Sequence, residues 1–205
     1  MEIRESILEA AHTLFHKYGI RSVSMDDIAR ELTISKKTIY QYFKDKDDLV
    51  YTVTKISMDM ERREMEDIEK SSVDAIDELA KISICMRKNL KDINPSLLFD
   101  LKKYHKKAWD QWLTFKNEFI KNNIVENLNK GIRKGFYRKE IDVEALAIFR
   151  VEQVQMTFDD GLYPSDKFEL SELQMQLFDH FVYGILTDEG RDLYKEYQDK
   201  LHKIN

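Results

Sequence analysis

The sequence of 205 residues has few residues that would break or cross-link a chain: one cysteine, two prolines and six glycines. The single cysteine, Cys85, excludes an intrachain disulfide and is typical of a reducing cytoplasm. No apolar run approaches the roughly 20 residues that a membrane-spanning helix needs, and the start, M-E-I-R-E-S, does not resemble a signal peptide. With 35% charged and 42% hydrophobic residues, the composition indicates a helical protein that is cytoplasmic and has no membrane partner.

Motifs that would indicate catalysis or metal binding are also missing from the sequence. We find no glycine-rich phosphate loop, no nucleophile elbow, no paired metal-ligand motif and no internal repeat. His12 and His16 have the i,i+4 spacing of a helical metal site, but we expect them on an exposed face of mixed charge. The sequence therefore predicts no catalytic residues, no metal and no cofactor, and an enzyme is not favoured.

Two short helices and a tight turn are predicted between residues 24 and 46. Ser24 is a natural N-cap for a helix over Met25–Leu32, and Ser35 for a helix over Lys36–Phe43, because a serine hydroxyl accepts a bond from a free N–H of the first turn. Two helices joined in this way form a helix-turn-helix, whose second helix enters the major groove of DNA. A helix over Glu2–Tyr18 completes a three-helix core.

The outward face of the second helix carries side chains that suit DNA. Lysines donate to guanine, a glutamine pairs with adenine, and tyrosine hydroxyls and further lysines suit phosphate oxygens. The free N–H groups at the two helix starts also bind anions. The predicted DNA-binding residues are Ser24, Ser35, Lys36, Lys37, Thr38, Tyr40, Gln41, Tyr42 and Lys46.

The formal net charge of −5 at first argues against nucleic acid, but its distribution matters more than its sum. Residues 33–46 contain four lysines and one aspartate, so this stretch has a local charge of 4 − 1 = +3. A solvated charged face would explain the lysines alone. It would not explain why they coincide with two caps and two exposed tyrosines.

The pattern L-T-I-S-K-K-T-I-Y-Q-Y-F-K-D-K-D-D-L over residues 32–49, preceded by F-x-x-x-G-I-R-S-V-S-M-D-D-I-A over residues 15–29, resembles the TetR family of transcriptional regulators. One departure is Thr33, where members often have glycine, so a non-glycine residue must tolerate a turn with positive φ. The resemblance implies an all-helical homodimer that binds a palindromic operator in double-stranded DNA. It also implies a variable C-terminal domain and repression relieved by a small-molecule effector.

The middle of the chain is rich in aromatic residues. After a helix over about 47–70 and another over Val73–Lys91, Asn94 and Pro95 predict a helix start, and a long helix is predicted over Lys106–Lys134. This region has the best materials for an apolar ligand pocket, although aromatic residues more often only fill a core. The candidate pocket residues are Phe99, Tyr104, Trp109, Trp112, Phe115, Phe119 and Met156.

The next predicted helix covers residues 143–160. The helix after it, over about 168–186, carries an apolar face too wide for one intrachain neighbour. The resemblance to TetR regulators implies that these two helices form the dimer interface, and the alternative is that the face is buried within one subunit. The candidate interface residues are Phe149, Leu173, Leu177, Phe178, Phe181, Gly184 and Ile185. A last, mostly polar helix is predicted over Asp188–His202.

Together these features predict an all-α protein, with a DNA-binding domain over residues 1–46 and an effector-binding and dimerisation domain over residues 47–205. The favoured function is a repressor that a small molecule releases from its operator. A second hypothesis is a DNA-binding activator or architectural protein that responds to a protein partner. The third is an all-α small-molecule or lipid carrier, or an enzyme, that keeps the helix-turn-helix only as scaffold.

Overall fold

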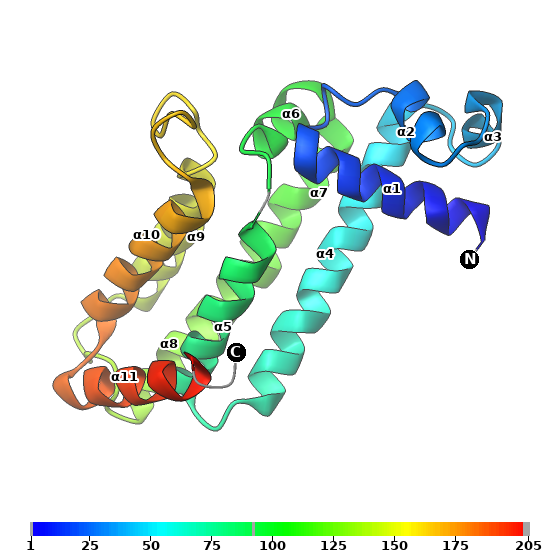
Figure 1. The fold of residues 1–205 in the computed structure, drawn as a ribbon. Coiled ribbons are helices and arrows are strands. Elements are labelled where there is room, and N and C mark those ends of the chain that lie inside the picture. The colour runs from blue at the N-terminus through cyan, green and yellow to red at the C-terminus, as the bar shows by residue number, and fades with distance from the viewer. Residues whose placement is uncertain (1, 92, 203–205) are drawn as a thin grey trace.

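The computed structural model describes residues 2–91 and 93–202, and within them the fold is all-helical, as predicted. The helices follow one another as α1 (Ile3–Tyr18), α2 (Met25–Glu31), α3 (Lys36–Tyr40), α4 (Lys46–Ser71), α5 (Ala75–Leu90), α6 (Leu97–Tyr104), α7 (Lys106–Thr114), the π-helix η1 (Phe115–Ile120), α8 (Lys121–Arg133), α9 (Val143–Met156), α10 (Leu170–Ile185) and α11 (Asp188–His202). Figure 1 shows α1 to α3 at one end, the long α4 leading away from them, and α11 across the opposite end. No helix in the described residues is long and apolar enough to cross a membrane.

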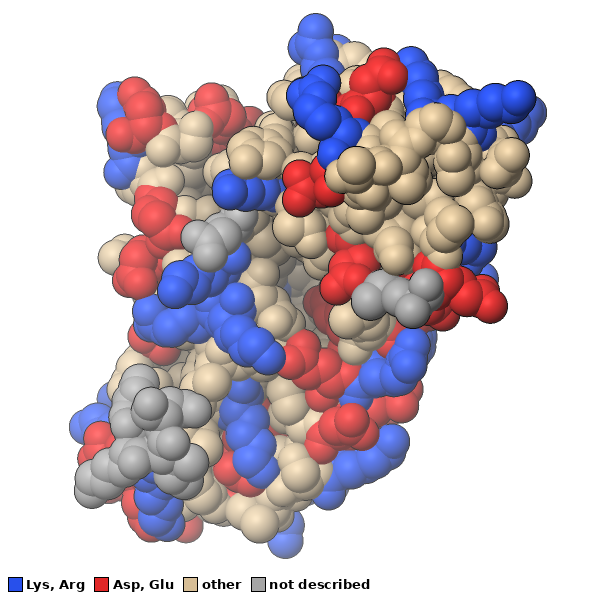
Figure 2. Space-filling view, turned by 45° about the vertical axis from the view of Figure 1, so that its right-hand side comes forward, with Lys and Arg blue, Asp and Glu red and all other residues tan. Residues whose placement is uncertain are grey.

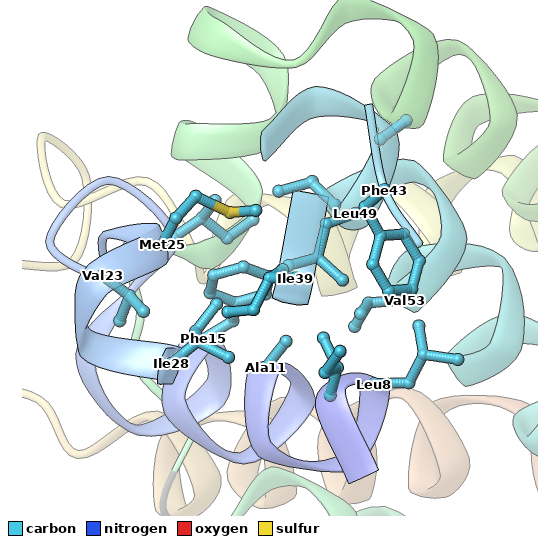
Figure 3. Packing of buried hydrophobic residues seen from close by; sticks show 14 of the residues in the cluster. Leu8, Ala11, Phe15, Val23, Met25, Ile28, Ile39, Phe43, Leu49 and Val53 are labelled. Atoms are coloured by element: carbon cyan, nitrogen blue, oxygen red, sulfur yellow. The ribbon is translucent and has the colours of Figure 1, made fainter. Parts of the chain in front are cut away.

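Helices α1 to α3 pack around a small hydrophobic core with the first turns of α4 (Figure 3). Phe15 of α1, Ile28 of α2, Ile39 of α3 and Leu49 of α4 all point into it and are almost completely buried. The same cluster also contains residues from much later in the chain, namely Leu98 and Leu101 of α6 and Ala108 of α7. The three-helix unit therefore shares its core with α6 and α7.

The helices predicted over 36–43 and 143–160 end earlier, at Tyr40 and Met156, and two further helices differ in their start or in their regularity. The helix expected to start at Pro95 begins at Leu97, because Oδ1 of Asn94 accepts from the backbone N–H of Ser96 in a local turn instead of capping a helix. The single helix expected over 106–134 is α7, η1 and α8 in succession, with one wider π-turn in the middle.

A second hydrophobic cluster lies toward the other end of the molecule and joins α5, α8, α10 and α11. Tyr137 is fully buried there, with its ring against Gly131 of α8. Its hydroxyl donates to the carbonyl oxygen of Ala75 at 3.0 Å or the amide oxygen of Asn127 at 2.8 Å. Gly131 thus lets a large ring approach the helix backbone closely.

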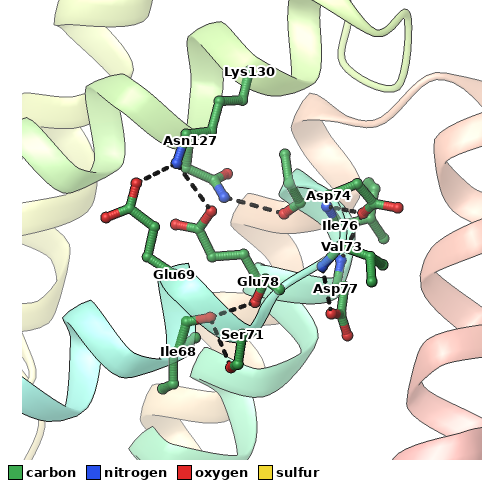
Figure 4. Close-up of polar contacts among 12 residues, drawn as sticks. Ile68, Glu69, Ser71, Val73, Asp74, Ile76, Asp77, Glu78, Asn127 and Lys130 are labelled. Carbon is green, nitrogen blue, oxygen red and sulfur yellow. Dashed lines mark hydrogen bonds and ion pairs between the residues drawn. The ribbon is translucent and has the colours of Figure 1, made fainter.

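Ion pairs and hydrogen bonds fasten the α4–α5 turn to α8 (Figure 4). Nζ of Lys130 lies 2.5 Å from a carboxylate oxygen of Glu69 and 3.6 Å from one of Glu78. The Nδ2 group of Asn127 donates to the carbonyl oxygen of Ala75. These contacts close the end of the bundle that lies far from α3.

Candidate functional site

The caps and the turn between α2 and α3 have the geometry that the sequence predicts. Oγ of Ser24 accepts from the N–H of Asp27, whose carboxylate in turn accepts from the N–H of Ser24 in a capping box. Oγ of Ser35 accepts from the N–H of Thr38. Thr33 has φ of 54°, so the positive φ expected in this turn is confirmed. The turn therefore holds α3 at a fixed angle to α2.

The outer face of α3 is exposed and basic. Lys37 is exposed and makes no ion pair with any described residue, whereas Nζ of Lys36 pairs with Asp26 at 2.8 Å. Gln41 is also exposed, as are both tyrosines, Tyr40 at 46% and Tyr42 at 42%. Figure 2 shows basic side chains at the upper end of the molecule. Lys37 is thus the cation of α3 that is free to meet an incoming phosphate or base.

The structure places Lys46 differently from the other predicted DNA-binding residues. Its Nζ donates to the carbonyl oxygen of Ile20 at 2.6 Å and lies 6.0 Å from the ring centre of Phe15. Its ammonium group therefore braces the α1–α2 loop instead of facing outward. Lys44, which the sequence reasoning left out, is exposed two residues earlier and makes no ion pair with a described residue. The signal for Lys44 was its place in the same basic stretch.

Several polar contacts tie the helix-turn-helix and the first turn of α4 to α6 and its ends. The carbonyl oxygen of His16 accepts from the N–H of Asn94 at 2.6 Å, and the N–H of Arg21 donates to Asp100 at 2.9 Å. The guanidinium of Arg21 lies over the ring of Tyr104. At the α6–α7 corner, Nδ1 of the buried His105 and Oδ1 of Asp47, in the first turn of α4, are 2.6 Å apart. A displacement of α6 would therefore act directly on α1, the α1–α2 loop and α4.

Comparison with known proteins agrees with this geometry. The model for bacterial regulatory proteins of the tetR family matches residues 7–52, which span α1 to the start of α4. An HTH-type transcriptional regulator of Bacillus subtilis (strain 168), YvaF, is 28% identical over 189 residues, which cover 91% of this chain and 97% of YvaF. This chain therefore carries the DNA-binding domain of the TetR family of transcriptional regulators.

Solved structures show that the fold of this TetR regulator is shared over nearly its whole length. A TetR-family transcriptional regulator from Agrobacterium tumefaciens aligns with a TM-score of 0.75 at 16% identity, covering 90% of this chain and 97% of that one. A putative transcriptional regulator from Saccharomonospora viridis in complex with choline aligns with a TM-score of 0.72 at 19% identity, covering the same shares. At these identities the likeness concerns the fold.

The predicted pocket residues of the regulator do not gather around one cavity. Tyr104 and Phe115 line an open groove of about 1180 Å³ between α4 and α7, whose other walls are mostly charged. Trp109 and Trp112 are partly buried and stacked on each other against the first core. Phe119 lies under the guanidinium of Arg62, with 4.1 Å from its Cζ atom to the ring centre. Phe99 and Met156 are exposed on the surface.

The predicted dimer residues of the regulator divide into two groups. Leu173, Phe178, Phe181 and Ile185 are buried inside the subunit, and the last three belong to the second core. These four are unavailable to a partner, because the wide apolar face of α10 is taken up by intrachain neighbours. Phe149 of α9 is 50% exposed and Gly184 of α10 is exposed, while Leu177 is partly buried. Ile148 and Met156, on α9, are also exposed.

Several ionisable groups of the regulator lie in its interior. His12 and His16 are partly buried and stacked with 4.0 Å between ring centres, so the expectation of an exposed face was wrong for both. Among the described residues no cluster could hold a metal ion. Cys85 is half-buried on α5, and burial together with Glu64 raises its pKa to about 12. A thiol with this pKa is unreactive at neutral pH.

We expect the stability of the regulator to depend on pH through His16. Burial, and secondarily the charge of His12, lowers the pKa of His16 from 6.5 to about 4. The unfolded chain therefore binds more protons between pH 6.5 and 4, so stability falls as pH falls through that window. Because His16 is partly exposed, we expect His16→Gln to remove only roughly 1 kcal/mol of this loss between pH 7 and pH 5. Urea unfolding of parent and variant at both pH values measures it.

Glu61 of α4 provides the opposite control for that experiment. It keeps contact with solvent, yet the surrounding protein and the nearby Glu64 raise its pKa from 4.5 to about 7. The folded state therefore binds more protons between pH 4.5 and 7, and this group destabilises the fold as pH rises. Glu61→Gln should gain stability relative to the parent at pH 8 and not at pH 4.5. Identical pH profiles for the parent and both variants would contradict these assignments.

Proposed function

We propose that this regulator is a homodimeric repressor that binds a palindromic operator through α3 and leaves it when a small molecule binds among the C-terminal helices. The DNA-binding domain is residues 1–46, and residues 47–205 bind the effector and dimerise. The exposed basic face of α3, with Lys37 free at its N-terminal end, is the observation that carries the proposal. The first residues of a recognition helix are the ones that reach base edges.

The surface of α9 supports the dimer. Its exposed apolar residues Ile148, Phe149 and Met156 lie on the side away from the buried Ala147 and Val151, so the helix is apolar on both sides. A helix that is apolar all round is normally buried all round. A second copy of the chain on this face would bury it and would set two α3 helices at the spacing of two half-sites.

The contacts around α6 support coupling between effector and DNA. Residues of α6 or of its ends make hydrogen bonds with His16 of α1, Arg21 of the α1–α2 loop and Asp47 of α4. A ligand that favours another position of α6 and α7 would therefore tilt α1 and α4, and with them α3. The structure with choline from Saccharomonospora viridis supports a small-molecule effector for this fold.

The proposal is tested by fluorescence anisotropy on the DNA that flanks the gene of this protein, against a scrambled duplex of the same composition. We expect tight, sequence-selective binding, with an affinity that falls steeply between 50 and 200 mM salt because phosphate contacts release counterions. Equally weak binding to both duplexes would argue against an operator in that region. A genome-wide selection of bound fragments with the same protein would then decide whether an operator exists elsewhere.

Lysine variants separate base reading from structural roles. Lys37→Ala should weaken operator binding about 10-fold and relax base preference, because it removes a donor that faces the groove. Lys44→Ala should weaken binding to operator and scrambled duplex alike, as expected of a phosphate contact. Lys46→Ala should instead lower the melting temperature, because its ammonium group holds Ile20. If Lys37→Ala binds the operator as the parent does, α3 is not the reading helix.

A further inference from the structure

Arg150, in the middle of α9, is a buried cation. Its side chain is 5% exposed and faces α5 and α10. Nη1 donates to the side-chain oxygen of Gln153 at 2.9 Å, and Nη2 lies 3.4 Å from the sulfur of Met86. The centre of the guanidinium is 5.0 Å from the ring centre of Phe178 and 5.9 Å from that of Phe181.

No carboxylate neutralises this charge. Among the described residues no acidic group pairs with Arg150, and burial alone lowers its pKa to about 10, so it stays protonated at neutral pH. A guanidinium has five N–H donors, and the two neighbours described above account for two of them. A buried charge without a counter-ion is costly, and proteins normally pair it.

Lys116 shows how the same domain treats another buried base. Its side chain is as deeply buried as that of Arg150, and its Nζ lies 2.6 Å from a carboxylate oxygen of Glu152 and 2.9 Å from the amide oxygen of Gln155. The contrast sets Arg150 apart, because it keeps donors but lacks an anion. A missing anion beside a buried cation indicates that a ligand supplies it.

The surroundings of Arg150 describe the rest of such a ligand. Ala147 and Val151, its neighbours on α9, are buried but belong to neither hydrophobic cluster, as are Met58 of α4 and Phe115 of η1. Buried apolar side chains of α4, η1 and α9 thus form a layer that belongs to neither core. Apolar and aromatic walls with one cation suit an amphiphilic anion.

Building on the proposed function, we propose that Arg150 binds the carboxylate of the effector, whose apolar chain or ring lies in the layer between the two cores. A guanidinium offers two parallel N–H groups, which match the two oxygens of a carboxylate. A ligand held there contacts α5, α9 and α10 at once. The effector class is thus an aliphatic or aromatic carboxylic acid.

The test is calorimetric titration of the full-length parent with dodecanoate and with 2-naphthoate, each below any micelle concentration. Dodecanol and dodecyltrimethylammonium serve as neutral and cationic probes of the same chain length. We expect at least one carboxylate to bind saturably, about 10-fold or more tightly than the neutral and cationic probes, because only the anion pairs with the guanidinium. No saturable binding of either carboxylate, or tighter binding of the cation, would overturn the proposal.

Two variants of Arg150 make the result specific. Arg150→Met should lose about 10-fold or more in carboxylate affinity while the ligand-free protein keeps or raises its melting temperature, because replacing a buried charge by an apolar side chain is often stabilising. Arg150→Lys should retain part of the affinity. The control Arg87→Met, which removes an exposed arginine of α5 paired with Glu172, should bind as the parent does. If Arg150→Met loses stability but not carboxylate affinity, Arg150 serves only the fold.

Operator binding of the same preparations, measured without ligand, separates this proposal from the proposed function. A parent that binds carboxylates but no operator would overturn the repressor and keep the ligand site. A parent that binds its operator but neither carboxylate would overturn the ligand site and keep the repressor. Release of the operator by the bound carboxylate links the two.

Discussion

Phe149→Glu should convert the proposed dimer into monomers and reduce operator binding about 100-fold or more, because each monomer reaches only one half-site. Phe149 is half exposed on α9, so the substitution leaves the fold of a single subunit intact. In a dimer the same carboxylate would be buried against an apolar partner face, where an unpaired charge is strongly unfavourable. Size-exclusion chromatography with light scattering gives the mass, and anisotropy on the operator gives the affinity.

Met60→Glu is the matched control for this prediction. Met60 lies on α4 and is 58% exposed. The substitution therefore introduces the same charge at another exposed apolar position of a helix. It should leave both the mass and the operator affinity unchanged. A dimeric Phe149→Glu with parental affinity would mean that α9 does not form the interface, and the exposed part of α10 around Gly184 would be the next surface to probe.

Gly131→Ala should destabilise the protein by about 1–3 kcal/mol, a large effect for one methyl group, because overpacking a filled core forces side chains and backbone to shift. A Cβ atom at this position would overlap the ring of Tyr137, which is fully buried and hydrogen-bonded to Ala75 and Asn127. The ring therefore has no free space into which it can move. Urea unfolding followed by circular dichroism measures the change.

A double variant distinguishes this clash from an effect of glycine on helix propensity. In the background of Tyr137→Leu the added methyl group meets a smaller side chain, so Gly131→Ala should cost clearly less there. Helix propensity alone would make Gly131→Ala stabilising by roughly 0.5–1 kcal/mol in both backgrounds. Equal destabilisation in the two backgrounds would show that the ring of Tyr137 is not what opposes the substitution.

The sequence was most informative where local chemistry decides the structure. Ser24 and Ser35 cap their helices because a serine hydroxyl can reach the free N–H groups of the next turn, whatever the rest of the chain does. The positive φ of Thr33 was expected from the resemblance to TetR regulators, which often have glycine at this position of the turn. Heptad-like spacing also placed Phe15 and Ile39 in the core, because each short amphipathic helix has only one face to bury.

The sequence was least informative where partners from distant segments decide the structure. Periodicity shows that Phe178 and Phe181 face something apolar, but not that the neighbours are α5 and α9 of the same chain. The buried Arg150 lies in the stretch I-F-R-V-E-Q, which reads like any exposed helical charge. Lys46 looked like a phosphate contact until the position of Ile20 was known. The π-turn at η1 leaves no signal in the spacing of apolar residues.

The core beneath α3 is built partly from α6 and α7, and this has a mechanical consequence. The hydrophobic core around Phe15 and Leu49 also contains Leu98, Leu101 and Ala108, which follow the helix-turn-helix by about fifty residues in the sequence. The helix-turn-helix and the helices that would bind a ligand thus share one hydrophobic core instead of being connected only through a linking helix. A molecule that displaces α7 would therefore shift the DNA-binding surface directly, because α7 is part of the hydrophobic core that supports that surface.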